Sequence, residues 1–228
     1  MTSERHGRHF QDDLEQVKTR LLEMGQLAVE RLTLAVTGLV DRRQEDLGVV
    51  MAGDEAINRL HIEIDDRCFK LLALHQPMAV DLRAIVAAVK INTDLERVGD
   101  LAVNIAETAE RYLRLPAVKE LVDIPRMNTI AHGMLRDALD AYVRSDTALA
   151  QKVLKCDDEL DRLKTRVFQE LLEHMVRDQG TVEASLDLIL ISRHLERVGD
   201  HATNIAEDVI FLVSAQDVRH QASARSEP

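Results

Sequence analysis

One charged segment occurs twice in this chain, 100 residues apart. LERVGDLAVNIAE occupies residues 95–107 and LERVGDHATNIAE occupies residues 195–207, and the copies differ at only two positions. The similarity extends upstream, where DEAINRL (54–60) aligns with DDELDRL (157–163) after a shift of 103 residues. A repeat of this length indicates that the chain consists of two halves built to one design.

The composition favours helices in both halves. Hydrophobic residues make up 46% of the 228 residues, aromatic residues only 3%, and tryptophan is absent. Abundant Leu, Ala, Glu and Arg with few Gly and Pro disfavours a β-sandwich or barrel. The formal net charge is −11, and there is neither a basic patch with stacking rings nor a polybasic cluster. We therefore expect an all-α protein that binds no nucleic acid and reaches a membrane only through partners.

The sequence also bears on location. Its first residues, MTSERHGRHF, contain no apolar signal region, and no apolar run approaches the length of a membrane span. Cys68 and Cys156 are too far apart in sequence to form a metal-type pair, and both lie in apolar-periodic stretches where they are expected to pack inertly. These features predict a cytoplasmic protein with reduced cysteines.

Hydrophobic periodicity predicts three helices in each half. The expected helices span 10–41, 44–75 and 80–114 in the first half, and 126–144, 147–177 and 181–214 in the second. Pro116 and Pro125 are expected to bracket a linker, because proline interrupts helices. The prediction is two pseudo-symmetric three-helix bundles, with domains at 1–115 and 126–214 and a disordered tail at 215–228.

The repeated segment places its acids on one stripe of the last helix in each half. At 100° per residue, Glu96 and Asp100 lie about 40° apart, and Leu82, Val86 and Val89 lie on the same side of the helix. The carboxylates therefore continue an apolar seam. Acids in such a seam repel one another and lose hydration, so we expect compensation by arginines, protons or metal ions.

The middle helices supply further oxygen donors at i,i+4 spacing. Two such pairs from adjacent antiparallel helices form an oxygen-rich site, which suits Mg, Ca, Mn or iron better than zinc. The first candidate site contains Asp54, Asn58, Glu96 and Asp100, and the second contains Asp157, Asp161, Glu196 and Asp200. Gly99 and Gly199 interrupt good helix sequence, which indicates the close approach of a neighbouring group.

Other interpretations of the same residues remain open. The acidic stripes are typical of solvated helix faces, where Arg97 and Arg197 would form weak surface ion pairs. On that view the chain is a structural scaffold. His61, His194 and His201 are interpreted as surface or packing residues rather than ligands. A further alternative is a metal-dependent helical enzyme, although no phosphate-binding loop, G-x-S-x-G, H-E-x-x-H or Glu-x-x-His motif occurs.

The two LERVGD segments, each on the last helix of a three-helix repeat, resemble the PhoU family of phosphate-transport accessory and regulatory proteins. The resemblance covers about residues 10–214 and is carried by QPMAVDLRAIVAAVKINTDLERVGDLAVNIAE and SRHLERVGDHATNIAEDVIFLV. It implies metal clusters of iron, zinc, magnesium or manganese at the acid-x-x-x-Asp positions. Asn58 departs from that pattern, because it offers an oxygen but no charge.

The resemblance also implies a non-catalytic role. Members of the family link the high-affinity phosphate ABC transporter to a sensor histidine kinase. They keep the phosphate-starvation response off and restrain phosphate uptake when phosphate is plentiful. The implied partners are the ATPase subunit of the transporter and the cytoplasmic sensor domain of the kinase. We expect a homodimer, held at the inner face of the membrane by these partners.

Overall fold

The computed structural model describes residues 2–53, 55–75 and 77–216, with side chains from His9 onward. Within these ranges the chain forms helices and no strands, which confirms the all-α prediction. The helices are α1 (Thr2–Val40), α2 (Gln44–Ala52), α3 (Glu55–His75), α4 (Val80–Leu113), α5 (Asp123–Arg144), α6 (Thr147–Arg177), η1 (Gln179–Thr181) and α7 (Val182–Ser214).

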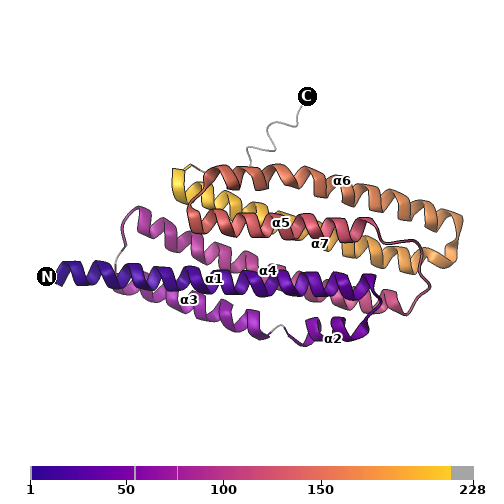
Figure 1. Ribbon diagram of the computed structural model, residues 1–228, viewed down its shortest axis with the longest axis horizontal. Coiled ribbons are helices and arrows are strands. Elements are labelled where there is room, and N and C mark those ends of the chain that lie inside the picture. The colour runs from indigo at the N-terminus through magenta and orange to yellow at the C-terminus, as the bar shows by residue number, and fades with distance from the viewer. Residues whose placement is uncertain (1, 54, 76, 217–228) are drawn as a thin grey trace, which may run out of the picture.

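The long helices form two bundles that lie side by side. Helices α1, α3 and α4 make the first bundle, and α5, α6 and α7 make the second, with their axes running along the length of the molecule (Figure 1). The short α2 packs against α1 and α4 at one end of the first bundle. The bundles meet where α4 packs on α7 and α1 packs on α5. The repeated segments of α4 and α7 are therefore neighbours in space.

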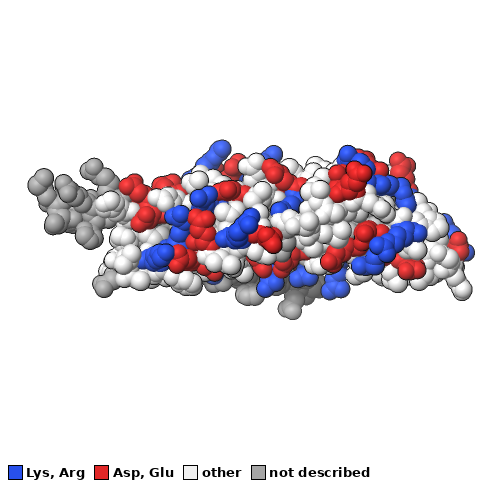
Figure 2. All heavy atoms as spheres, turned by 90° about the horizontal axis from the view of Figure 1, so that it is seen from below, with Lys and Arg blue, Asp and Glu red and all other residues white. Residues whose placement is uncertain are grey.

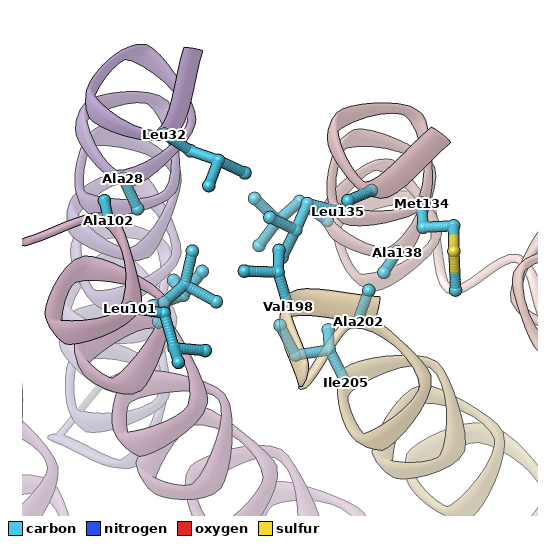
Figure 3. Packing of buried hydrophobic residues seen from close by; sticks show 14 of the residues in the cluster. Ala28, Leu32, Leu101, Ala102, Met134, Leu135, Ala138, Val198, Ala202 and Ile205 are labelled. Carbon is cyan, nitrogen blue, oxygen red and sulfur yellow. The ribbon is translucent and has the colours of Figure 1, made fainter. Parts of the chain in front are cut away.

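One hydrophobic core continues across the boundary between the bundles. Leu32 of α1 and Leu101 of α4 face Leu135 of α5 and Val198 of α7 (Figure 3). All four side chains are buried and belong to one cluster of buried residues. Small residues such as Ala102 allow the helices to approach closely at this level. The two repeats therefore share a single core.

The predicted helix over 44–75 is wrong in one respect, because α2 ends at Ala52 and α3 begins at Glu55. Gly53 separates them, and glycine is a weak helix residue. A Cβ atom at this position would lie 2.5 Å from Nη1 of Arg31, so the guanidinium fills the space that a side chain would need. Cys156 occupies the equivalent position in the second half, where α6 is continuous.

The predicted boundary at Pro125 is also wrong. Helix α5 begins at Asp123, so this proline lies within its first turn rather than at the end of a linker. Proline is tolerated there because the first amide groups of a helix have no intrahelical acceptor. The predicted tail falls mostly outside the described residues, which end at residue 216. Among the described helices, none has the length and hydropathy to span a membrane.

Candidate functional site

The four predicted acids of the second half lie close together, where α6 packs on α7. Gly199 is central to this contact, because a Cβ atom there would lie 2.5 Å from Cδ2 of Leu160 and 3.4 Å from Oδ1 of Asp157. The missing side chain therefore lets α6 bring Asp157 towards the acids of α7. The close approach expected at this glycine is found, and a neighbouring side chain makes it.

The electrostatics of these acids show incomplete charge compensation. The pKa of Asp157 is raised to about 6, first by burial and then by the carboxylates of Asp200, Asp161 and Glu196. The pKa of Asp200 is raised as well, by burial and by Glu196 and Asp161, although nearby cationic groups oppose the shift. Each acid raises the proton affinity of its neighbours because like charges at short range destabilise the ionised forms.

Lys164 of α6 supplies one positive charge to this cluster. Its Nζ donates hydrogen bonds to Oδ1 of Asp161 at 2.8 Å and to Oε1 of Glu196 at 2.5 Å. Sequence reasoning expected a cationic group in the seam but did not identify this lysine. The equivalent residue in the first half is His61, so the repeat gave no signal for it.

The second-half acids offer donor atoms that suit a metal ion, but they are not arranged as a metal site. Carboxylate oxygens suit hard cations. Nevertheless, in the part of the chain that the structure describes, no three His, Cys, Asp or Glu side chains converge to hold a metal ion. The ammonium of Lys164 bridges Asp161 and Glu196, and it would have to withdraw for both carboxylates to bind one ion.

The first-half acids are compensated in a different way. Arg97 pairs with both of them, with Nε 3.4 Å from Oε2 of Glu96 and Nη1 3.2 Å from Oδ2 of Asp100. Gly99 of α4 also allows a close helix contact, because a Cβ atom there would lie 2.9 Å from Cδ1 of Ile57 on α3. Asn58, the predicted oxygen donor, is the next residue after Ile57 on α3. Asp54, the fourth predicted residue of this site, lies outside the described residues.

A polar contact between the bundles was missed by sequence reasoning. Nδ1 of His201 in α7 lies 2.8 Å from Oδ1 of Asp94 in α4, and Nδ2 of Asn204 donates to the same oxygen at 3.2 Å. One turn away along α4, Lys90 Nζ donates to Oδ1 of Asp208 at 2.7 Å. His201 is thus a packing residue, as interpreted, but its ring joins the two halves. The repeat gave no signal for this pair, because the residues equivalent to Asp94 and His201 are His194 and Leu101.

Comparisons with known proteins identify the family. The PhoU domain matches residues 21–109 and 124–209. The chain is 38% identical over 213 residues to the phosphate-specific transport system accessory protein PhoU homolog of Caulobacter vibrioides, covering 93% of each chain. It is 34% identical to the phosphate-specific transport system accessory protein PhoU of Serratia marcescens, covering 92% of this chain and 87% of that one.

Solved structures give the same result. The crystal structure of PhoU from Pseudomonas aeruginosa superposes with a TM-score of 0.86 at 36% identity, covering 91% of this chain and 100% of that chain. The phosphate transport system regulatory protein PhoU from Streptococcus pneumoniae superposes with a TM-score of 0.84 at 27% identity, covering 92% and 99%. The family domain occurs once in each bundle, over most of its length. This chain is a member of the PhoU family.

Proposed function

We propose that the chain is a regulatory adaptor that links the phosphate ABC transporter to its sensor histidine kinase. In this role it restrains phosphate uptake and keeps the phosphate-starvation response off when phosphate is plentiful. The observation that carries the proposal is the family domain in both bundles, together with relatives named for phosphate-specific transport. The role requires a protein that binds partners, and no catalytic step is assigned to it.

The architecture supports an adaptor in two ways. Two elongated bundles with one shared core form a stiff body with long helical faces, on which partner proteins can bind (Figure 1). The lower side of the molecule in Figure 1, where α2 and α3 lie, carries Lys and Arg interspersed with Asp and Glu when it is seen from below (Figure 2). Mixed charge of this kind gives specific pairing rather than general attraction to one sign of charge. We propose that the protein works in the cytoplasm, held at the inner membrane by its partners.

Phosphate uptake tests the proposed restraint of the transporter. In medium rich in phosphate, a strain that lacks this chain should take up radiolabelled phosphate faster than the parent strain. A plasmid copy of the wild-type chain should restore the slower initial rate. An unchanged uptake rate in the deletion strain would contradict this part of the proposal.

We also propose that the acidic clusters bind metal ions, drawn from Mg, Mn, Fe or Zn. The support is the oxygen-donor set of Asp157, Asp161, Glu196 and Asp200, together with the burial and the neighbouring carboxylates that raise the pKa of Asp157. Binding requires that Lys164 withdraw from Asp161 and Glu196. A bound cation would neutralise and stiffen this seam. The first-half set (Asp54, Asn58, Glu96 and Asp100) offers less charge because Asn58 is neutral and Arg97 already pairs with two acids.

Metal analysis by mass spectrometry tests this second proposal. Untagged protein purified without chelator is compared with a variant in which Glu96, Asp100, Glu196 and Asp200 are replaced by Ala. We expect more than one ion per wild-type chain and a loss of these ions in the variant. Wild-type protein without metal would leave the carboxylates as solvated or partner-binding groups and refute the metal proposal, although the adaptor role would stand.

A further inference from the structure

A groove in the second bundle has features that the first bundle lacks. It lies between α6 and α7 and encloses about 670 Å³, with Lys164 and Phe168 on one wall and Ile189, Arg193 and Arg197 on the other. Glu196 and Asp200 reach the same groove, so it adjoins the acidic cluster. The groove therefore combines an apolar section with a strongly charged one.

The apolar section extends beyond the groove along both helices. Phe168 and Leu172 are one turn apart on α6, and their exposed fractions are 47% and 46%. On α7, Val182 and Leu186 are also exposed and lie on the same side as Ile189 of the groove, within about 60° by helix rotation. We call these five residues the α6–α7 apolar strip. Exposed apolar side chains in a contiguous strip are typical of a surface that a partner covers.

The charged section holds two arginines that the protein does not use internally. Arg193 and Arg197 are exposed and lie at i,i+4 on α7, so both guanidinium groups project to one side of that helix. Within the described part of the chain neither forms a hydrogen bond or an ion pair, unlike Arg97, which pairs with two acids. Two guanidinium groups on one side of a helix are well placed to bind a carboxylate with charge-assisted hydrogen bonds.

The equivalent positions in the first bundle do not provide this combination. Thr93 replaces Arg193, and Asp65 replaces Phe168. Asp65 is occupied internally, because it accepts a hydrogen bond from Nδ2 of Asn92 at 2.9 Å. The first bundle keeps exposed apolar residues at three other positions of the strip, namely Phe69, Leu82 and Val86 in place of Leu172, Val182 and Leu186. The unpaired arginines beside an apolar groove are thus specific to the second bundle.

We propose that this groove binds an amphipathic helix of a partner protein, which places apolar side chains on Phe168 and Leu172 and a carboxylate on Arg193 and Arg197. The distance from Val182 to Arg197 along α7 is about 22 Å at 1.5 Å per residue, which suits a helix of about 15 residues. Apolar anchors at i, i+3, i+4 and i+7 are the usual form of such helix-in-groove recognition. The inference rests on the proposed adaptor function, which requires that the occupant is a protein.

Charge distinguishes this occupant from others. Repulsion between two copies, each with a net charge of −11, opposes a dimer contact through this groove, so we expect the homodimer to form through another surface. An anionic lipid surface would bring many phosphate charges against Glu196 and Asp200 in the same groove, whereas a single carboxylate on a partner helix can contact the two arginines alone. The chain's own residues 217–228, DVRHQASARSEP, contain two arginines and only one large apolar residue, so their sequence does not match an acidic amphipathic helix.

Binding measurements with the full chain test the inference. The probes are the purified ATPase subunit of the phosphate transporter and the cytoplasmic sensor domain of the kinase, each measured by biolayer interferometry. We expect one of them to bind the wild-type chain and to lose affinity at least about tenfold with R193E/R197E and with L172D. The controls are F69D, the first-bundle counterpart of L172D, and R136E/R144E, which makes the same charge change on α5. Both controls should stay within about twofold.

A charge-reversal rescue shows that lost binding is not lost folding. Hydrogen exchange of the complex locates the partner helix, and replacing its acidic residue with arginine should restore binding to R193E/R197E. Partner binding that is insensitive to both groove variants would overturn the groove assignment and leave the adaptor role intact. Failure of the wild-type chain to bind either probe would contradict the adaptor role itself, and with it the proposed occupant.

Two further outcomes would assign the groove to a different occupant. A wild-type dimer that becomes monomeric in R193E/R197E, detected by light scattering, would assign the groove to a second copy. Co-sedimentation with phosphatidylglycerol vesicles that is lost in the same variant would assign it to a lipid surface. Either result overturns the proposal of a partner helix.

Discussion

At Gly199, the absence of a side chain determines how closely α6 approaches α7. A Cβ atom would lie 2.5 Å from Leu160, which is fully buried and cannot move without disturbing its neighbours. We expect Gly199→Ala to destabilise the protein by about 1 kcal/mol, because overpacking costs about 1–3 kcal/mol and the helix propensity of alanine returns about 1 kcal/mol. Urea unfolding followed by circular dichroism measures the change.

Gly133 of α5 provides the matched control. A Cβ atom there meets nothing within 4 Å, so Gly133→Ala keeps the gain in helix propensity without a clash. This variant should be more stable than the wild type by about 0.5–1 kcal/mol. If both alanine variants gain stability equally, the close approach at Gly199 does not constrain the α6–α7 contact.

Asp157 should make the stability of the protein depend on pH. Its pKa is raised from 3.8 to about 6, so between pH 4 and 6 the folded protein binds more protons than the unfolded chain. The contribution of this group to stability therefore falls as pH rises through that window. Asp157→Asn should remove this loss of stability and stabilise the protein at pH 7 by an amount on the order of 1 kcal/mol. The effect is kept this small because Asp157 is partly exposed and solvent screens its charge.

Urea unfolding at pH 4.5 and pH 7, with chelator present, measures this dependence. The difference in unfolding free energy between Asp157→Asn and the wild type should be larger at pH 7. Asp158→Asn is the control, because Asp158 is adjacent in sequence but exposed. A variant at Asp157 that lowers stability at pH 7 would show that its charge is compensated in solution.

At the scale of single helices, α6 begins at a well-formed cap. Oδ1 of Asp146 accepts a hydrogen bond from the backbone N–H of Leu149 at 3.0 Å, which satisfies one amide of the first turn. Asp146→Ala should cost about 1 kcal/mol of stability, whereas Asp146→Asn should cost little because asparagine also caps helices well. Thermal unfolding of the two variants compares them, and equal losses would show that charge rather than capping matters.

Most of the helices could be predicted from the sequence, because amphipathic periodicity over 20–30 residues reports directly which face is buried. The break at Gly53 could not, since it depends on the side chain of Arg31, which packs there from a distant part of α1. The start of α5 was predicted too late because Pro125 was taken to interrupt the helix, whereas proline is tolerated in a first turn. Local sequence therefore locates the helices but does not fix all of their ends.

The candidate site was predictable to a similar extent. The repeat predicts Asp157, Asp161, Glu196 and Asp200 as one group, and after burial the other three carboxylates contribute to the raised pKa of Asp157. Their role as metal ligands stays a prediction. Lys164 was missed because its first-half equivalent is His61. The Asp94–His201 contact was missed because it joins the two halves, and the equivalent residues, His194 and Leu101, do not repeat it. The repeat therefore indicates what the two halves share, and residues that differ between the halves leave no trace in it.

For the whole molecule, the shared core predicts that both bundles unfold together. The chain has two tyrosines and no tryptophan, so each half carries one natural fluorophore. Tyr112 in α4 and Tyr142 in α5 are each 1% exposed. In the single-tyrosine variants Tyr142→Phe and Tyr112→Phe, the urea transition seen by fluorescence should coincide with that seen by circular dichroism of the same variant. A fluorescence midpoint that differs from the circular dichroism midpoint would indicate two independent units.

The most direct test of the adaptor role is a reporter of the phosphate-starvation response, measured in medium rich in phosphate. We expect the reporter to be on in a strain lacking this chain, and off again when the gene for the sensor kinase is also deleted. That result would place the chain upstream of the kinase, as an adaptor requires. A reporter that stays off in the single deletion, or stays on in the double deletion, would contradict the adaptor role.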